Sequence, residues 1–430
     1  MEINITYEQA LEKASPRLRK LMEHSYEVLR KGEKLALFYD PQDGYWCGFS
    51  GGKDSQALYH MAQLAGVKFK AFFSPTSIDP PEVIRFIRKN YPEVGFTPLK
   101  TSIFTMFEKK KTLPSRRIRW CCAEFKEKGG EGKVTLVGVR HSESARRANR
   151  GTISVTNHKF NGEFDEFEQY REDKRNAKLK TLDNKRKKMQ REVRMGRMTE
   201  EEYQQFDEWS QHQEKMVTCV GGKDKIVISP LLEWNDTDVW EFLNNVVEVP
   251  HCELYGQGYK RIGCIGCPMA SPKNQRAQFE RWPHVKERWI KSIMKVRKQS
   301  IEELKEWSKR DGQSPPEYHI QRNLPEQKTI FYPPKNDSVA IDAENGHDVS
   351  KMPSSPRKLV PIARYHWSAG MAGFSDSSND ISSFIGAYNE EEEREIAENI
   401  LDWWISKLPY KEWYAKKFTP RLFNDNELEQ

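Results

Sequence analysis

The chain has 430 residues, a net charge of +7 and 31% charged residues. No run of 18 apolar residues occurs, which excludes a membrane-spanning protein, and the first residues lack a signal-peptide pattern, so we expect a cytoplasmic protein. The length predicts one large domain with an additional part, and the positive net charge favours anionic partners.

The first part of the chain alternates between helical and strand patterns. In order, the pattern predicts a helix over 8–32, strands over 34–39, 45–49 and 67–73, a helix over 82–89 and a strand over 133–139. Such alternation is typical of an α/β fold with a doubly wound, mostly parallel sheet. Ligands of such sheets bind at the carboxyl ends of the strands.

The most informative stretch follows the predicted strand 45–49 and reads Ser-Gly-Gly-Lys-Asp-Ser. The glycines allow close approach of the backbone, and the start of the following helix presents unpaired N–H groups to an anion. Hydroxyl groups and one ammonium add further donors, so the stretch predicts a pyrophosphate-binding turn. An ordinary strand-to-helix turn is the alternative. The candidate ligands are Ser50, Gly51, Gly52, Lys53, Asp54 and Ser55.

A second candidate phosphate ligand comes directly after the predicted strand 133–139. Arg140 stands at that position, and a parallel sheet would place it at the same edge as the glycine-rich turn. Its guanidinium can bind phosphate oxygens in pairs, and Arg146 offers the same chemistry. Surface charge at the start of a helix is the alternative.

Residues 157–216 differ in character from the rest of the chain. Between Lys174 and Arg197 there are eleven Lys or Arg residues and only two acidic ones, and an acidic stretch follows. We expect a charged helical insertion, folded as a hairpin with its turn near Gly196. Its basic half could grip a nucleic-acid backbone. The alternative is a solvated pair of helices whose charges neutralise each other.

This insertion interrupts one α/β domain, which we expect over 1–156 and 217–290. The remaining region, 291–430, is expected to be mainly helical with loops. Within it, helices are predicted near 282–309 and 391–408, and a loop rich in Pro, Ser, Asn and Asp is predicted over 311–360.

Four of the seven cysteines form two close pairs, Cys121-Cys122 and Cys264-Ile-Gly-Cys267. A Cys-x-x-Cys loop that contains glycine can aim two thiolates at one soft metal. Adjacent cysteines suit an iron–sulfur cluster better than the two-knuckle geometry of structural zinc. We therefore predict a [4Fe–4S] cluster held by Cys121, Cys122, Cys264 and Cys267, with Zn²⁺ as the alternative.

The glycine-rich turn resembles the PP-loop of the ATP pyrophosphatase superfamily, which has a HUP-like α/β fold and includes the PAPS reductases and tRNA thiolases. The cysteine pairs resemble those of the iron–sulfur adenylylsulfate reductases, and the resemblance covers about residues 40–290. It implies that residues 50–55 and Arg140 bind ATP or a related adenylyl nucleotide. It further implies that Lys53 and Asp54 are catalytic, with Asp54 orienting the loop or binding Mg²⁺.

The resemblance does not extend to one catalytic feature of the reductases. They use a cysteine near the C-terminus as nucleophile, and no cysteine follows Cys267 in this sequence. The arrangement is also similar to the sulfurtransferase of DNA phosphorothioation and to iron–sulfur tRNA thiolases. It therefore implies an ATP pyrophosphatase-type sulfurtransferase that adenylates tRNA or DNA and receives sulfur from a donor such as a cysteine desulfurase.

Two alternatives stay open. One is an adenylylsulfate or phosphoadenylylsulfate reductase that uses an external thiol. The other is a nucleotide-sensing, nucleic-acid-binding component of a phage or defence complex. ATP turnover separates the enzyme from the sensor, and the oligomeric state does not follow from the sequence.

Overall fold

The computed structural model describes residues 3–156, 159–215, 224–308, 389–408 and 413. Contacts between residues divide the chain into two units, one of 1–99 with 122–263 and one of 100–121 with 264–430. This division assigns 100–121 and 264–290 to the unit of the C-terminal helices, whereas the sequence-based boundaries placed both in the α/β domain. The predicted loop over 311–360 lies outside the described residues.

The first unit is built on a seven-stranded sheet with the order β3-β2-β1-β4-β7-β5-β6. Neighbouring strands from β3 to β7 in this order run parallel, whereas β5 is antiparallel to β7 and to β6. The strands are β1 (Tyr45–Gly48), β2 (Phe69–Phe73), β3 (Gly95–Phe96), β4 (Val134–Leu136), β5 (Ile153–Val155), β6 (Phe160–Gly162) and β7 (Ile226–Ile228).

The strand order confirms the predicted α/β class with a doubly wound, mostly parallel sheet. From β1 the chain runs outward through β2 to β3, and then returns to the other side of β1 for β4 and β7. The direction of winding therefore reverses between β1 and β4. Sheets of this kind form a crevice for ligands at the carboxyl ends of the strands next to this reversal.

Helices flank the sheet, and two of them differ from the predicted pattern. In the first unit they are α1 (Tyr7–Lys13), α2 (Pro16–Tyr39), α3 (Lys53–Leu64), α4 (Pro81–Asn90), α7 (Ala145–Ala148), α8 (Phe164–Arg194), α9 (Glu200–Lys215) and α10 (Asp236–Glu241). Short turns of helix lie over His141–Glu143 and Phe242–Val246, and α6 (Trp120–Phe125) spans the boundary between the units.

The predicted strand over 34–39 is wrong, because these residues form the last turns of α2. Leu35 and Ala36 are buried and continue the apolar face that Val28 and Leu29 present one to two turns earlier. The short apolar run over 34–39 is therefore part of the helical repeat of α2. The predicted single helix over 8–32 is two helices, because Ser15 caps α2 through its side chain and Pro16 begins it.

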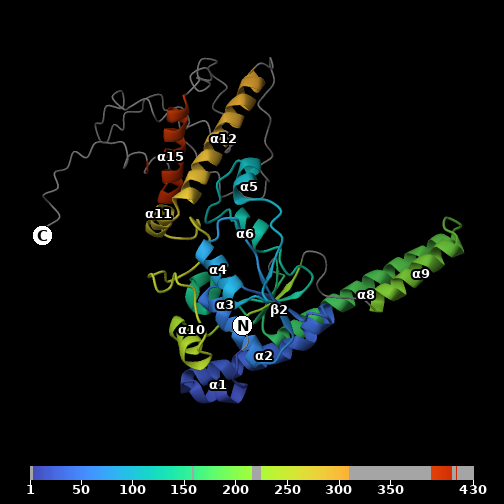
Figure 1. Ribbon diagram of the computed structural model, residues 1–430. Coiled ribbons are helices and arrows are strands. Elements are labelled where there is room, and N and C mark those ends of the chain that lie inside the picture. Colours follow the sequence, from blue (N-terminus) through green and yellow to red (C-terminus); the bar gives the residue numbers. More distant parts are fainter. Residues whose placement is uncertain (1–2, 157–158, 216–223, 309–388, 409–412, 414–430) are drawn as a thin grey trace, which may run out of the picture. The chain divides into compact units, whose positions relative to one another are not determined.

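The charged insertion forms the predicted helical hairpin of α8 and α9, which lie side by side (Figure 1). Gly196 has a φ of +69° in the turn that connects them. Arg186 on α8 donates to the Asp207 carboxylate at 2.5 Å and to the Ser210 hydroxyl at 2.6 Å. These bonds from a largely buried guanidinium hold the two helices together.

In the described part of the second unit the regular elements are helices, as predicted for the C-terminal region. They are α5 (Ile103–Lys110), α11 (Pro272–Arg281), α12 (Pro283–Ser308) and α15 (Glu390–Ser406). Trp289 on α12 is buried, and its ring lies 5.2–5.6 Å from the rings of Phe104, Phe107 and Trp404. This aromatic cluster joins α5 and α15 to α12 and explains why residues 100–121 belong to this unit. None of the helices that the structure describes is long and apolar enough to cross a membrane.

A buried histidine lies in the core of the first unit. His60 on α3 is fully buried, and its ring nitrogens lie 2.9 Å from the Tyr91 hydroxyl and 2.8 Å from the Gln63 side-chain oxygen. Burial lowers the pKa of His60 to about 4, because the charged imidazolium loses its solvation there. The imidazole is therefore neutral in the folded protein at neutral pH.

We expect His60 to make the stability of the chain sensitive to acid. The folded-state pKa lies below the unfolded one, so the contribution is complete above about pH 6.5 and is lost as the pH falls toward 4. Between pH 7.5 and pH 5 the free energy of unfolding should fall by about 2 kcal/mol from this group. Urea denaturation of the His60→Gln variant should lack this part of the decrease. The exposed control, His24→Gln, should retain it, and equal pH dependence of both variants would contradict the assignment.

Candidate functional site

The glycine-rich turn lies between the end of β1 and the start of α3, at the carboxyl edge of the sheet. Ser55 binds back to the turn: its hydroxyl accepts from the backbone N–H of Ser50 at 3.1 Å and donates to the carbonyl of Gly52 at 2.8 Å. Gly52 is the N-cap of α3 and provides no side chain to cap it. The N-cap side chain therefore occupies none of the backbone donors in the first turn of α3, which suits an anionic ligand.

Gly51 is required by the conformation of this turn. Its φ is +70°, a value that residues with a side chain rarely adopt. A Cβ atom there would also lie 3.0–3.1 Å from side-chain atoms of Val83 and Ile87 on α4. The absence of a side chain at this position thus lets the turn pack closely against α4.

Two cations and two carboxylates meet beside the turn. The Lys53 ammonium lies 3.5 Å from the Asp54 carboxylate and 3.4 Å from that of Asp236. The Arg140 guanidinium lies 2.9 Å from Asp54 and 2.5 Å from Asp236. Lys53 and Arg140 are only 4% and 2% exposed, so the pairs are largely shielded from water on the cationic side. The structure thus brings together three predicted site residues that the sequence separates by up to 87 positions.

The pKa of Asp236 shows how the charges of these four residues affect one another. Burial alone would raise the pKa of this carboxyl, but the hydrogen bond from Arg140 and the charge of Lys53 hold it below its usual value. The Oδ1 atom of Asp54 and the Nε atom of Arg140 are buried and make no hydrogen bond among the described residues, although they lie 2.9 Å apart. The two atoms therefore attract each other as an ion pair without a well-aligned hydrogen bond.

Sequence analysis did not assign two of the residues at the site. Asp236 is the first residue of α10, which follows β7 in the chain. The Tyr255 hydroxyl accepts from the backbone N–H of Lys53 at 2.8 Å, and so occupies one of the donors at the start of α3. No local pattern identifies either residue, because each approaches the turn from another part of the chain.

The family model for the phosphoadenosine phosphosulfate reductase domain matches residues 44–270, which is more than half of the chain and includes this site. The chain belongs to this family. Adenine-nucleotide binding at the carboxyl edge of the sheet fits this membership, because the donors of the turn and the two buried cations suit phosphate groups.

Individual relatives are distant or match only locally. A stretch of 287 residues, 66% of this chain, is 23% identical to an uncharacterized protein of Methanocaldococcus jannaschii and covers 55% of it. A stretch of 57 residues, 13% of this chain, is 35% identical to the adenosine 5′-phosphosulfate reductase of Oceanobacillus iheyensis and covers 23% of it. The chain thus matches about half the length of the archaeal relative and about a quarter of the reductase.

Among solved structures, the FMN adenylyltransferase of Candida glabrata is similar with a TM-score of 0.34 and 15% identity. The match covers 64% of this chain and 77% of that protein.

The cysteine pairs do not form a metal site in the described part of this family member. No three side chains of Cys, His, Asp or Glu gather there closely enough to share a metal ion. All four predicted ligands are partly exposed. Cys122 belongs to the first unit, whereas Cys121, Cys264 and Cys267 belong to the second. The cluster at these four cysteines stays a prediction.

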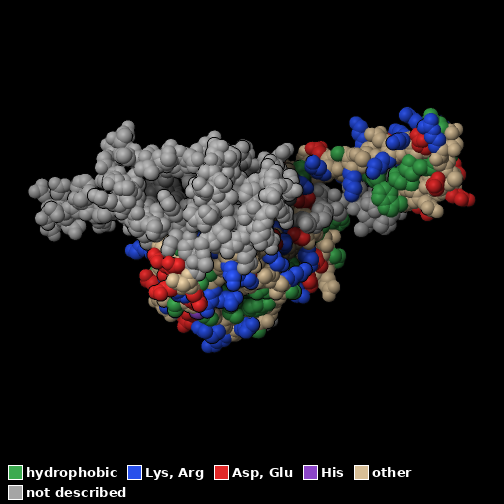
Figure 2. Space-filling model, turned by 90° about the horizontal axis from the view of Figure 1, so that it is seen from above, with side chains coloured by type: hydrophobic (Ala, Val, Ile, Leu, Met, Phe, Trp, Pro, Cys, Tyr) green, Lys and Arg blue, Asp and Glu red, His purple; other side chains and the backbone are tan. Residues whose placement is uncertain are grey.

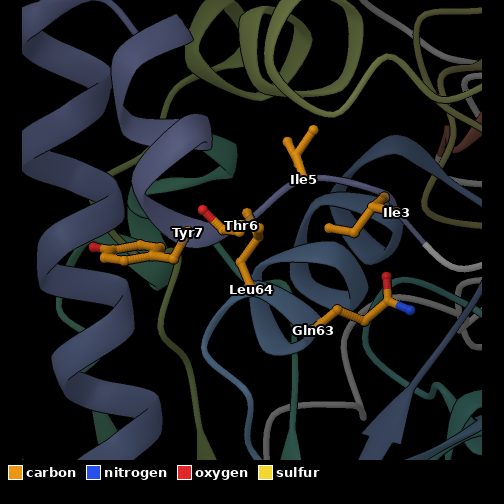
Figure 3. A pocket seen from close by; sticks show the side chains of 6 residues that line it. All are labelled: Ile3, Ile5, Thr6, Tyr7, Gln63 and Leu64. Atoms are coloured by element: carbon orange, nitrogen blue, oxygen red, sulfur yellow. The ribbon is translucent and has the colours of Figure 1, made fainter.

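A pocket of about 300 Å³ lies at the other end of α3 from the glycine-rich turn (Figure 3). Tyr7 is its one ionisable side chain, so it offers no fixed charge to a phosphate group at neutral pH. Its lining residues are Ile3, Ile5, Thr6, Tyr7, Gln63 and Leu64.

Neutralising Asp236 should strengthen binding of anions at the turn. In the Asp236→Asn variant, Lys53 and Arg140 lose one competing carboxylate while the shape of the side chain is kept. A charge at this distance in a well-solvated position is worth about 1 kcal/mol, so the affinity for pyrophosphate should rise about fivefold. Isothermal titration calorimetry measures this, with Asp43→Asn as a control remote from the turn. Weaker binding in Asp236→Asn would mean that Asp236 mainly positions Arg140.

Proposed function

We propose that this member of the family binds ATP, or a related adenylyl nucleotide, through residues 50–55 and Arg140. One observation carries the proposal: an open, glycine-rich helix N-terminus lies beside the buried cations Lys53 and Arg140 at the reversal of the sheet. Backbone N–H groups and a helix dipole favour the pyrophosphate there, and the two cations offset its charge.

The proposed reaction is cleavage of ATP between its α and β phosphates. An oxygen of the acceptor attacks the α-phosphorus, a new O–P bond forms, and the bond to the β-phosphate oxygen breaks to release pyrophosphate. Lys53 would stabilise the charge that develops on the phosphate oxygens. The Asp54 carboxylate pairs with Lys53 and Arg140 beside the turn, so Asp54 would orient the turn or hold Mg²⁺ with the nucleotide.

We further propose that the acceptor is a nucleic acid, tRNA or DNA, and that adenylation prepares it for sulfur transfer. A hydrosulfide equivalent, supplied by a cysteine desulfurase together with a thiol, would displace AMP. The acceptor's bond to oxygen is then replaced by a bond to sulfur, with no net change in oxidation state. The resemblance to sulfurtransferases and the net charge of +7 support this acceptor class.

A metal held by the cysteine pairs is a separate prediction. Anaerobically purified protein should contain about four irons per chain if Cys121, Cys122, Cys264 and Cys267 hold a [4Fe–4S] cluster. The Cys264→Ala variant should lose the iron and the visible absorption together. Stoichiometric zinc without iron would show that the cysteines bind Zn²⁺, the alternative metal, and not a cluster.

The second candidate function is reduction of a sulfonucleotide. Local identity to two adenosine 5′-phosphosulfate reductases over 57 and 58 residues supports it. Two external thiols would be oxidised to a disulfide, the bond between sulfur and the phosphate oxygen would break, and sulfite and AMP would be released. This route needs no cysteine after Cys267.

Identification of products from α-labelled ATP tests these proposals. Formation of AMP and pyrophosphate that increases with tRNA or DNA, with label transiently bound to the nucleic acid, is the expected result. Release of sulfite from adenylylsulfate in the presence of dithiothreitol, without ATP cleavage, would identify the reductase instead. Tight nucleotide binding with neither reaction would leave a nucleotide sensor.

A further inference from the structure

The outer surface of α8 has an unusual composition between residues 180 and 194. Eight side chains are exposed there, six of them Lys or Arg and the other two Thr181 and Asn184. The two acids of this stretch, Asp183 and Glu192, are half-buried and pair with Lys187 and Arg197. We define the basic surface of α8 by its exposed cations, Lys180, Lys185, Lys187, Lys188, Arg191 and Arg194.

Contacts within the hairpin do not use this surface. Leu182 is buried, Arg186 binds Asp207 and Ser210, and Gln190 donates to the Tyr203 hydroxyl at 2.7 Å. These positions recur every four residues and form the side of α8 that contacts α9. Among the described residues, only Lys187 of the basic surface has an acidic partner. Figure 2 shows Lys and Arg side chains along the hairpin, at the right of the view.

Such a surface is costly for an isolated helix. Lys185 and Lys188, Lys188 and Arg191, and Arg191 and Arg194 are each three positions apart, and like charges at that spacing destabilise a helix by a few tenths of a kcal/mol per pair. An anionic partner would remove this repulsion. Positions 180–194 extend over about 21 Å of helix, which is long enough to follow several consecutive phosphates of a nucleic acid.

We propose that the basic surface of α8 binds the phosphate backbone of the nucleic-acid acceptor. This inference rests on the proposed function for the identity of the partner. The exposed positions from 180 to 194 contain no apolar side chain. A protein partner would need an apolar interface core, whereas a phosphate backbone needs only cations and hydrogen-bond donors. α9 exposes acids such as Glu200, Glu201 and Glu208, so the backbone approaches α8 and not α9.

Fluorescence anisotropy with 20-base-pair DNA and RNA duplexes, each tested from 50 to 200 mM salt, measures this binding. The test variant carries Lys180→Glu, Lys185→Glu, Lys188→Glu and Arg191→Glu and leaves Arg186 in place. At 100 mM salt its affinity should fall at least tenfold, and the slope of log K against log salt should become shallower by about 3. The duplex that loses more affinity identifies the preferred backbone, DNA or RNA.

The matched control reverses four exposed lysines on other helices, Lys20, Lys34, Lys89 and Lys109, so that both variants have the same net charge. The control should bind within threefold of the original chain. Equal losses in the two variants, no duplex binding by the original chain, or equal competition by polyglutamate would each overturn the proposal.

Cleavage of ATP without added nucleic acid should be unchanged in the test variant. Absence of ATP cleavage by the original chain when nucleic acid is present would contradict the proposed function and leave duplex binding to be judged separately.

Discussion

Replacement of Lys53 by methionine is expected to reduce the rate of pyrophosphate release from ATP by about 100- to 1,000-fold. The ammonium is almost fully buried at the start of α3, next to the open backbone donors of the turn. A positive charge held in place there stabilises the charge of the transition state without reorganisation of solvent. Methionine has a similar volume and no charge, so the packing around α3 should be kept.

The measurement is the steady-state rate of pyrophosphate formation, together with the affinity for ATP. The matched control is the Lys34→Met variant, which replaces an exposed lysine on α2 and should leave the rate and the affinity unchanged. Thermal unfolding followed by circular dichroism shows whether the fold is intact. A folded Lys53→Met protein with a rate within threefold of the original would remove Lys53 from the catalytic residues.

Replacement of Gly138 by alanine is expected to abolish nucleotide binding at concentrations at which the original chain is saturated. A Cβ atom at this position would lie 2.6 Å from the backbone carbonyl oxygen of Asp54 and 3.0 Å from its carbonyl carbon. Backbone atoms cannot move aside as a flexible side chain can, so the first turn of α3 must shift. Overpacking of this kind costs about 1–3 kcal/mol of stability.

The matched control is Gly48→Ala at the end of β1. A Cβ atom there would lie 3.5 Å from the Leu136 carbonyl oxygen, an ordinary contact. The control should bind ATP with an affinity close to that of the original chain, as measured by calorimetry. If Gly138→Ala binds equally well, the segment after β4 and the glycine-rich turn do not need to approach so closely.

The sequence by itself determined the class of the fold and the place of the glycine-rich turn. Strand-like and helix-like segments alternate along the sequence, and turn residues separate them. This alternation depends only on neighbouring residues, and it predicted the mostly parallel sheet. The pattern of residues 50–55 is equally local, because a positive φ and an open helix start depend on adjacent residues. The turn of the α8–α9 hairpin at Gly196 was predicted for the same reason.

Local sequence patterns gave a wrong prediction where a short apolar run fitted both a strand and a helix. Residues 34–39 resembled a strand, but their burial continues the apolar face of α2. Only packing against the rest of the core distinguishes these alternatives.

Tertiary structure alone decided the composition of the site. Asp236 and Tyr255 reach the turn from segments about 180 and 200 residues further along the chain. Long-range contacts of this kind depend on how the strands are ordered, and here β1, β4 and β7 bring Lys53, Arg140 and Asp236 to one edge. The sequence predicted the site residues Lys53, Asp54 and Arg140, but the carboxylate of Asp236, which pairs with both cations, became visible only in the folded chain, because charge pairing depends on distance in space.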